Sequence, residues 1–158
     1  MKPESQDQRD AVVAEAASWI GTPYQHRGRL KGIAADCAGL PLCVYETAGV
    51  IPPTDVGFYS EQWMLNRSEE VYLKWVRGFG RQIGHKLAGG MTIEGDAPGV
   101  GDFVVWKWWR TFSHGAIVEA WPKIIHAYVD ARMVTRDDAS IHEELLRREA
   151  FIDRKSVV

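Results

Sequence analysis

The sequence predicts an α+β fold, because two kinds of hydrophobic periodicity follow one another along the chain. Apolar residues recur at helical spacing over 7–20 and again over 37–48, and short apolar runs typical of strands follow from residue 102 onward. Helices that precede a series of closely connected strands indicate helices packed on an antiparallel sheet. The chain has 158 residues, 46% hydrophobic and 25% charged, which predicts a single globular domain over 1–158 with its own core.

The first helix is expected over 7–20. Its apolar positions lie at helical spacing: Val12, Val13, Ala16, Ala17, Trp19 and Ile20. Gly21, Thr22 and Pro23 then stop the helix, and the polar, glycine-interrupted residues 24–35 predict a loop.

The second helix is expected over 37–48, where Leu40, Val44 and Ala48 share one face and Gly49 follows as a helix stop. Pro41 has no backbone N–H to donate to the carbonyl of Cys37. The first turn must therefore be loose, or Cys37 must lie at the very edge of the helix.

The remaining elements are expected in the following order. Residues 57–76 are partly helical, and the glycine-rich residues 77–100 form a long irregular surface excursion. Strands are expected over 102–106, 115–120 and 123–129, with Trp121 and Pro122 in a turn. A charged segment over 139–148 predicts a short helix, and Phe151 and Ile152 predict a last edge strand.

Charge and composition exclude several classes of function. A net charge of -2 without a basic run does not favour a nucleic-acid partner. The polar N-terminus and the lack of a long apolar stretch predict no signal peptide and no membrane span, so synthesis in the cytoplasm is expected. Cys37 and Cys43 lack a CxxC pattern and point to different sides of one helix, so neither a zinc site nor a mutual disulfide is expected. We expect no metal and no cofactor.

Three residues are candidates for catalysis: Cys37, His114 and His126. A thiol at a helix start has a lowered pKa, a nearby imidazole can take its proton, and early backbone N–H groups of the helix can form part of an oxyanion hole. A turn at 120–122 places residue 116 opposite residue 126, so that both histidines share one face of the sheet about 7–8 Å apart. His126 is then expected to orient His114.

Other histidines and the tryptophans have simpler interpretations. His142 lies in a charged run, which predicts that it belongs to a solvated face. His85 lies in the glycine-rich segment 77–100, which predicts a position on the surface. His26 precedes Cys37 and is a weaker candidate for the cleft. The seven tryptophans, among them Trp106, Trp108 and Trp109, fit either core and surface anchors or an aromatic-lined cleft. Cys37, His114 and His126 also fit a simple buried core.

Taken together, five segments of the chain resemble the NlpC/P60 family of cell-wall cysteine peptidases. They are Trp19-Ile20-Gly21-Thr22-Pro23-Tyr24, Asp36-Cys37-Ala38-Gly39-Leu40, Gly101-Asp102-Phe103-Val104, Ser113-His114 and Ile125-His126-Ala127. The resemblance implies a papain-like α+β fold and a thiol peptidase that cleaves peptidoglycan stem peptides, typically between γ-D-glutamate and a diamino acid. The long segment between the two halves looks most like the phage-associated subgroup, which implies action on the cell wall as part of a phage particle.

The resemblance also implies roles for single residues. The nucleophile falls on Cys37, the base on His114 and the third polar residue on His126, while Tyr24 and Asp36 fall on substrate-binding positions. Asp36 also fits a helix N-cap. The chain departs from the pattern at Ala38, where serine is usual, at Pro41, and at Gly115-Ala116, where Val-Gly is usual. Loss of the serine hydroxyl puts recognition of a free N-terminal amine in doubt.

Two other hypotheses remain open on the sequence. One is a structural or assembly component, for example of a phage tail, with a vestigial site; 77–100 and the aromatic loop around Trp106–Trp109 are then interaction surfaces. The other is an acyl-transfer enzyme that uses the same three residues on lipids or amides.

Overall fold

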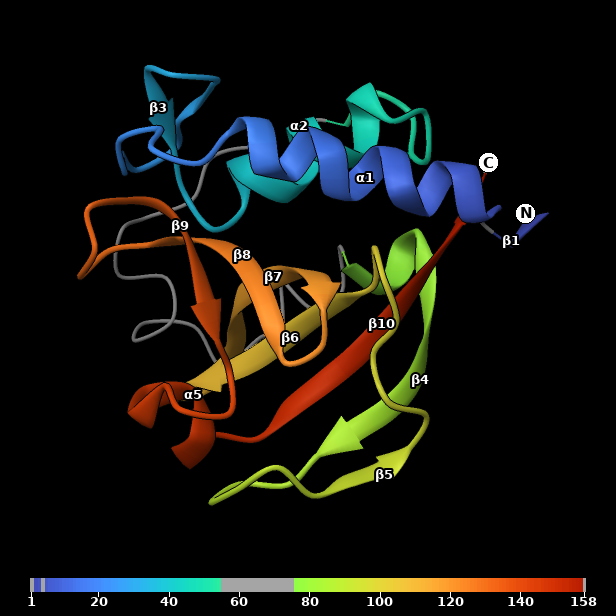
Figure 1. Ribbon diagram of the computed structural model, residues 1–158, viewed down its shortest axis with the longest axis vertical. Coiled ribbons are helices and arrows are strands. Elements are labelled where there is room, and N and C mark those ends of the chain that lie inside the picture. The colour runs from blue at the N-terminus through green and yellow to red at the C-terminus, as the bar shows by residue number, and fades with distance from the viewer. Residues whose placement is uncertain (1, 4, 55–75, 158) are drawn as a thin grey trace.

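The computed structural model describes residues 2–3, 5–54 and 76–157, and it places two helices, α1 and α2, against a curved antiparallel sheet (Figure 1). The strands of the main sheet follow the order β5-β4-β10-β6-β7-β8-β9, and β1 pairs with β10. Their bounds are β1 Lys2–Pro3, β4 Gly80–Lys86, β5 Ile93–Gly95, β6 Phe103–Trp108, β7 Thr111–Ala120, β8 Lys123–Tyr128, β9 Met133–Asp138 and β10 Ala150–Val157. None of the described helices is long and apolar enough to cross a membrane.

Helix α1 spans Gln6–Ser18 and confirms the first predicted helix. Ser5 caps it: the Ser5 side chain accepts from the backbone N–H of Gln8 at 3.2 Å, and the Gln8 side chain accepts from the backbone N–H of Ser5 at 2.9 Å. The helix ends before residue 20 because Trp19 and Ile20 donate to carbonyls three residues earlier, which tightens the last turn.

Helix α2 spans Gly39–Thr47, so Cys37 lies just before the helix, at its edge. Pro41 falls in the first turn, where backbone N–H groups have no intrahelical partner, and it therefore removes no helical hydrogen bond. The predicted loop 24–35 contains a small hairpin of β2 (Arg29–Leu30) and β3 (Ala34–Ala35).

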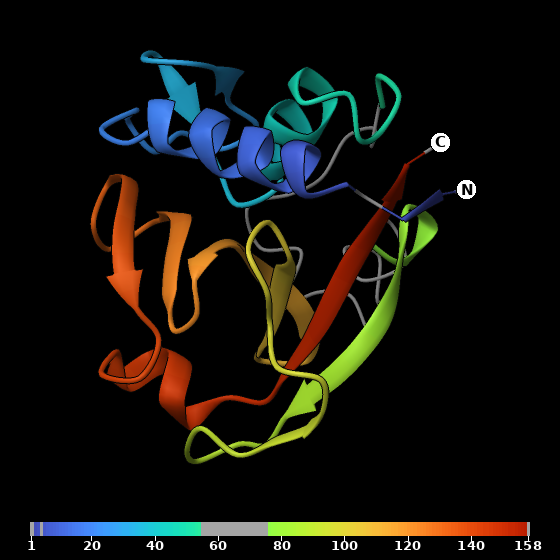
Figure 2. The same cartoon turned by 45° about the vertical axis from the view of Figure 1, so that its right-hand side comes forward.

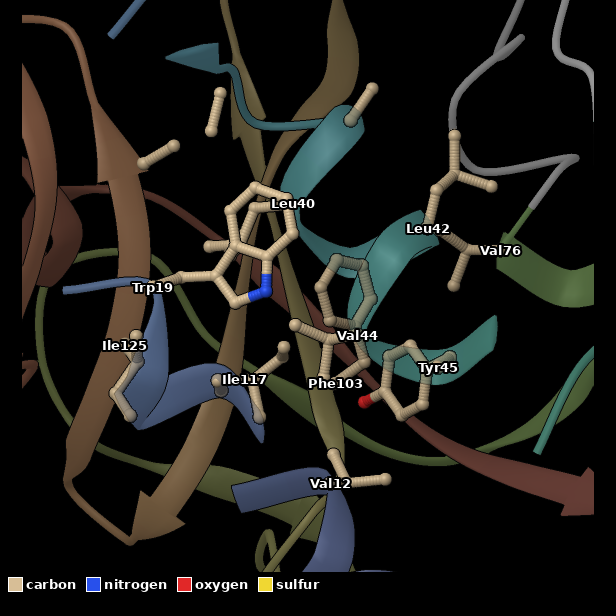
Figure 3. Close-up of a cluster of buried hydrophobic side chains, with 14 of the residues drawn as sticks. Val12, Trp19, Leu40, Leu42, Val44, Tyr45, Val76, Phe103, Ile117 and Ile125 are labelled. Atoms are coloured by element: carbon tan, nitrogen blue, oxygen red, sulfur yellow. The ribbon is translucent and has the colours of Figure 1, made fainter. Parts of the chain in front are cut away.

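The sheet has a buried layer on each face, as the alternation along β6 shows. Phe103 and Val105 pack with α1 and α2, while Val104 and Trp106 pack with the short helix α5 (Glu143–Arg147). Figure 3 shows the first layer, in which side chains of α1, α2 and the strands converge: Val12, Trp19, Leu40, Val44, Tyr45, Phe103, Ile117 and Ile125.

Two predictions about the sheet are wrong, and one strand was missed. Residues 77–100 are not an irregular excursion, because they contain β4 and β5; the sequence of β4, Gly-Arg-Gln-Ile-Gly-His-Lys, has little apolar alternation to reveal it. Residues 151–152 are not an edge strand, because β10 lies inside the sheet between β4 and β6. Strand β9 was not predicted at all, since its sequence is mostly polar.

The other segments fit the expectations more closely. The three strands expected over 102–129 correspond to β6, β7 and β8, and the short helix expected over 139–148 corresponds to α5. The segment predicted as partly helical, 57–76, lies outside the described residues apart from Val76. Figure 2 shows α1 and α2 on one side of the sheet, with both ends of the chain close together where β1 pairs with β10.

Candidate active site

Cys37 lies on the wall of a small cavity of about 50 Å³ beside the start of α2. Its Sγ is 3.4 Å from the carbonyl oxygen of Ser113 on β7, and the residue is 8% exposed. The cavity is lined by Tyr24, Cys37, Trp108, Ser113, His114, Ala127, Tyr128 and Val129. Two of the predicted catalytic residues, Cys37 and His114, and the predicted substrate-binding residue Tyr24 therefore meet at one cavity.

The two histidines of β7 and β8 are bonded to each other. His114 Nε2 lies 2.8 Å from His126 Nδ1, and both rings are buried. Ile117 pairs with Ile125, as in the predicted register, although a bulge beyond Val118 makes Ala120, not residue 119, the partner of Lys123. The histidines share one face because the bulge lies on the turn side of them, so the register that sets their contact is undisturbed.

The chain of polar contacts continues to a residue that sequence reasoning missed. His126 Nε2 is 2.6 Å from Oδ2 of Asp137 on β9. Asp137 lies two residues beyond Thr135, the strand partner of His126, so it is a diagonal neighbour on the same face. The strand that carries Asp137 has the sequence Met-Val-Thr-Arg-Asp-Asp, in which no apolar alternation continues beyond Val134, so the sequence holds no clear signal for it.

Burial sets the protonation of this site. Burial, with a further contribution from the Asp36 carboxylate, raises the pKa of the Cys37 thiol well above its ordinary range. Burial also lowers the pKa of His114 and of His126, the latter against the opposing effect of the Asp137 hydrogen bond. The resting site therefore holds a neutral thiol and neutral imidazoles, which differs from the lowered thiol pKa expected at a helix start.

Asp36 organises the turn that carries Cys37. Its Oδ1 accepts from the backbone N–H groups of Ala38 at 3.1 Å and Gly39 at 2.7 Å, and its Oδ2 accepts from that of Arg27 at 2.7 Å. The residue is buried and does not line the cavity, and His26 Nδ1 lies 3.9 Å from its Oδ2. Ala38, not Asp36, is the N-cap residue of α2, although the Asp36 carboxylate binds the N–H groups of Ala38 and Gly39 from two residues before the helix boundary. A role of Asp36 in binding substrate stays a prediction.

The tryptophans near the site divide between core and surface. Trp106 is buried, Trp108 lines the cavity with its ring centroid 5.4 Å from that of His114, and Trp109 is 69% exposed at φ 58°. Arg148 stacks on Trp108, its guanidinium carbon 3.7 Å from the ring centroid. Among the tryptophans that the structure describes, Trp108 is thus the one in the cavity wall.

His142 and His85 are less peripheral than expected. The ring of His142 lies 5.0 Å from that of Tyr128 and 6.1 Å from that of His126, and its Nδ1 is buried without a hydrogen-bond partner in the described part of the chain. His85 belongs to β4, where Nε2 is 3.0 Å from Oε2 of Glu149. Among the described residues, no cluster of histidine, cysteine and carboxylate side chains is arranged to hold a metal ion.

Comparison with known proteins identifies the fold. No protein-family model and no curated protein sequence matches the chain. The solved NlpC/P60 domain of the peptidoglycan hydrolase SagA matches with a TM-score of 0.56 and 22% identity, over 90% of this chain and 97% of that domain. A lipoprotein-like protein of the NLP/P60 family from Staphylococcus aureus matches with a TM-score of 0.61 and 16% identity, over 99% of this chain but 44% of its own.

A third match differs in function. RipD from Mycobacterium tuberculosis, a non-catalytic NlpC/P60 domain protein adapted to peptidoglycan binding, matches with a TM-score of 0.52 and 14% identity, over 95% of this chain and 98% of its own. The fold thus occurs with and without catalysis. From its helices, its antiparallel sheet and these matches, the chain has the papain-like α+β fold of NlpC/P60 domains.

Proposed function

We propose that this chain is a cysteine peptidase that hydrolyses stem peptides of peptidoglycan, with Cys37 as nucleophile, His114 as base and His126 as the orienting residue. The observation that carries the proposal is the cavity shared by Cys37 and His114, with Nε2 of His114 bonded to Nδ1 of His126. The likeness in fold to SagA, a peptidoglycan hydrolase, supports the substrate class.

In this mechanism, His114 removes the Sγ–H proton as the sulfur attacks the carbonyl carbon of the scissile peptide bond. The carbonyl electron pair moves to the oxygen and returns as the C–N bond breaks, and the leaving amine takes the proton from His114. A thioester on Cys37 remains. Water then attacks the thioester with His114 again as base, and the Cys37 sulfur leaves with the proton. Because thiol and imidazole rest in their neutral forms, proton transfer accompanies the attack.

The oxyanion needs a donor other than the first helical amides. The N–H groups of Ala38 and Gly39 already donate to Asp36, which differs from the role expected for early-helix amides. Tyr24 lies on the cavity wall with Cys37, and we assign its hydroxyl to the developing oxyanion. A cavity of about 50 Å³ has room for the reacting amide group, so the rest of a stem peptide must lie outside it.

The finer specificity rests on the sequence motifs. The resemblance of these motifs to NlpC/P60 peptidases implies cleavage between γ-D-glutamate and a diamino acid, and the long segment between the two halves of the chain implies action on the cell wall as part of a phage particle. Asp36 is the proposed neighbour of the substrate amine, and Ala38 leaves that amine with one hydroxyl contact fewer than a serine would give.

The experiment compares the two cysteines of the chain. Cys37→Ala should abolish release of new amino groups from purified peptidoglycan, while Cys43→Ala, which removes the cysteine outside the cavity, should retain activity. Mass spectrometry of the soluble products identifies the bond. Activity of Cys37→Ala at the wild-type level would exclude the proposed nucleophile.

A second candidate function is peptidoglycan binding or particle assembly without catalysis, including assembly of a phage tail. The buried thiol with a raised pKa and the non-catalytic match RipD favour it. Sedimentation with peptidoglycan distinguishes the two: a binder without turnover sediments with intact peptidoglycan, and its Cys37→Ala variant behaves as the wild type.

A further inference from the structure

The series of hydrogen bonds that begins at His114 does not end at His126. It crosses three neighbouring strands, from His114 on β7 through His126 on β8 to Asp137 on β9, with contacts of 2.8 Å and 2.6 Å. Burial changes along it, because the His126 side chain is fully buried and the Asp137 side chain is 31% exposed. The fully buried His126 is therefore bonded to a carboxylate that is partly in contact with solvent.

We propose that Asp137 is a positioning residue of this site, which fixes the tautomer of His126 and thereby selects the nitrogen of His114 that receives the thiol proton. Its effect on turnover rests on the proposed function, whereas its effect on the histidine tautomers does not. Asp137 does not line the cavity, and its hydrogen bond to the site is made to His126.

The order of protons along the chain follows from the chemistry of each group. The hydrogen bond from His126 lowers the pKa of Asp137, so its carboxylate is ionised and can only accept. Nε2 of His126 must therefore carry the proton that it donates. The His126 ring is neutral, so its Nδ1 is an acceptor, and Nε2 of His114 must be the donor to it. Nδ1 of the neutral His114 ring is then unprotonated and able to accept the Sγ–H proton of Cys37.

The opposite order of protons also satisfies the hydrogen bond between the two histidines, but it leaves His114 unable to act as the base. If His126 carried its proton on Nδ1, it would donate to Nε2 of His114, and Nδ1 of His114 would carry a proton. That ring could not accept a proton from the thiol. Nothing in the contact between two histidines chooses between these orders, because each ring can donate from either nitrogen. The carboxylate of Asp137 makes the choice.

The position of Asp137 is suited to this role. Strand pairing of His126 with Thr135 fixes where the carboxylate lies. On its other side, Asp137 lines an open surface groove of about 510 Å³ with Glu119, Lys123, Arg136 and Asp138. The hydrogen bond from His126 and the solvent in this groove both favour the charged carboxylate.

The test uses Asp137→Ala, with Glu119→Gln as the matched control. Glu119 lines the same groove but pairs with Arg136, not with a histidine. Long-range ¹H–¹⁵N spectra of histidine-labelled protein report the tautomers. In the wild type and in Glu119→Gln, His114 and His126 should both carry the proton on Nε2. In Asp137→Ala, the Nδ1–H form of His126 should appear, and kcat on peptidoglycan fragments should fall about 10–100-fold with little change in KM.

Asp137→Asn provides a second variant of the same size if the alanine variant does not fold. Its amide can either donate or accept, so the Nδ1–H form of His126 should again appear. Unchanged tautomers in the variants, or a changed tautomer with wild-type kcat, would overturn the inference. If the wild type itself cleaves no peptidoglycan, the proposed function fails, and the tautomer comparison alone decides the role of Asp137.

Discussion

At the scale of single residues, Cys37 is controlled by its neighbour in sequence. Asp36 holds the backbone that positions the thiol, with three N–H groups donating to its carboxylate. The same charge adds to burial in raising the pKa of Cys37. Asp36 therefore stabilises the turn of the site and at the same time makes the resting thiol less acidic.

Asp36→Asn should separate these two effects. Asparagine keeps an oxygen for the N–H groups of Ala38 and Gly39 but removes the negative charge, so the pKa of Cys37 should fall. The thiolate is the reactive form, and the rise of the Cys37 alkylation rate with pH should therefore move to lower pH. Burial is the larger cause, so the pKa should remain raised.

The measurement is the rate of iodoacetamide labelling against pH in a Cys43→Ala background, where Cys37 is the remaining thiol. Circular dichroism and thermal unfolding check that the variant is folded. A labelling profile that coincides with that of the Asp36 parent would contradict the assigned electrostatic effect.

At the scale of elements, Asp102 joins the first helix to the centre of the sheet. Its fully buried carboxylate accepts from Arg154 of β10 at 3.0 Å and 2.8 Å, and from Arg9 of α1 at 3.3 Å. The adjacent carbonyl of Gly101 accepts from the hydroxyl of Tyr45 on α2 at 2.8 Å. The Gly101-Asp102 pair of the motif is thus a structural junction between both helices and the strands, away from the cavity.

Asp102→Ala should therefore destabilise the fold without altering the site chemistry. Removing one partner of a buried ion pair costs about 3–5 kcal/mol, and the partial exposure of Arg9 and Arg154 places the expected loss near the lower end, about 3 kcal/mol. Urea unfolding measures it. Asp96→Ala, at an exposed position nearby, is the control and should change stability by less than about 0.5 kcal/mol. Equal free energies of unfolding for the two variants would show that Asp102 does not stabilise the contact between the first helix and the sheet.

Some elements were predictable because local patterns agree with tertiary packing. The two helices have clear stops, and β6, β7 and β8 carry apolar runs because both of their faces are covered. That agreement extended to the contact between His114 and His126, whose register depends only on a short turn. Their catalytic role remains a prediction that rests on this geometry.

Other elements were not predictable because charged side chains occupy their strands. Asp153 and Lys155 of β10 are buried as a pair at 2.6 Å, and Lys155 also donates to the carbonyl of Val76 at 3.0 Å. The sequence of a buried strand that contains its own ion pair has the same polar pattern as a surface segment. Asp137 was missed for a related reason, since β9 is a polar edge strand whose importance lies in one side chain.

At the scale of the whole molecule, the candidate site lies where the two layers meet. Helix α2 brings Cys37 to the sheet from the side of the first core layer, while the histidines belong to the face that carries Ile124 and packs against Leu145 of α5. Each partner is therefore held by a different part of the core, and the cavity between them depends on the complete fold. This arrangement explains why residues so distant in sequence, Cys37 and His114, meet at one cavity.

The central claim is that Cys37 forms a covalent thioester with its substrate. It is tested most directly by mixing the protein with a defined stem peptide, quenching in acid and measuring the mass of the Cys37 peptide. The account predicts a mass increase equal to the acyl part of the substrate on that peptide, formed as the amine product is released and absent from the peptide that contains Cys43. Release of product while Cys37 stays unmodified, and turnover that survives its replacement, would contradict the account.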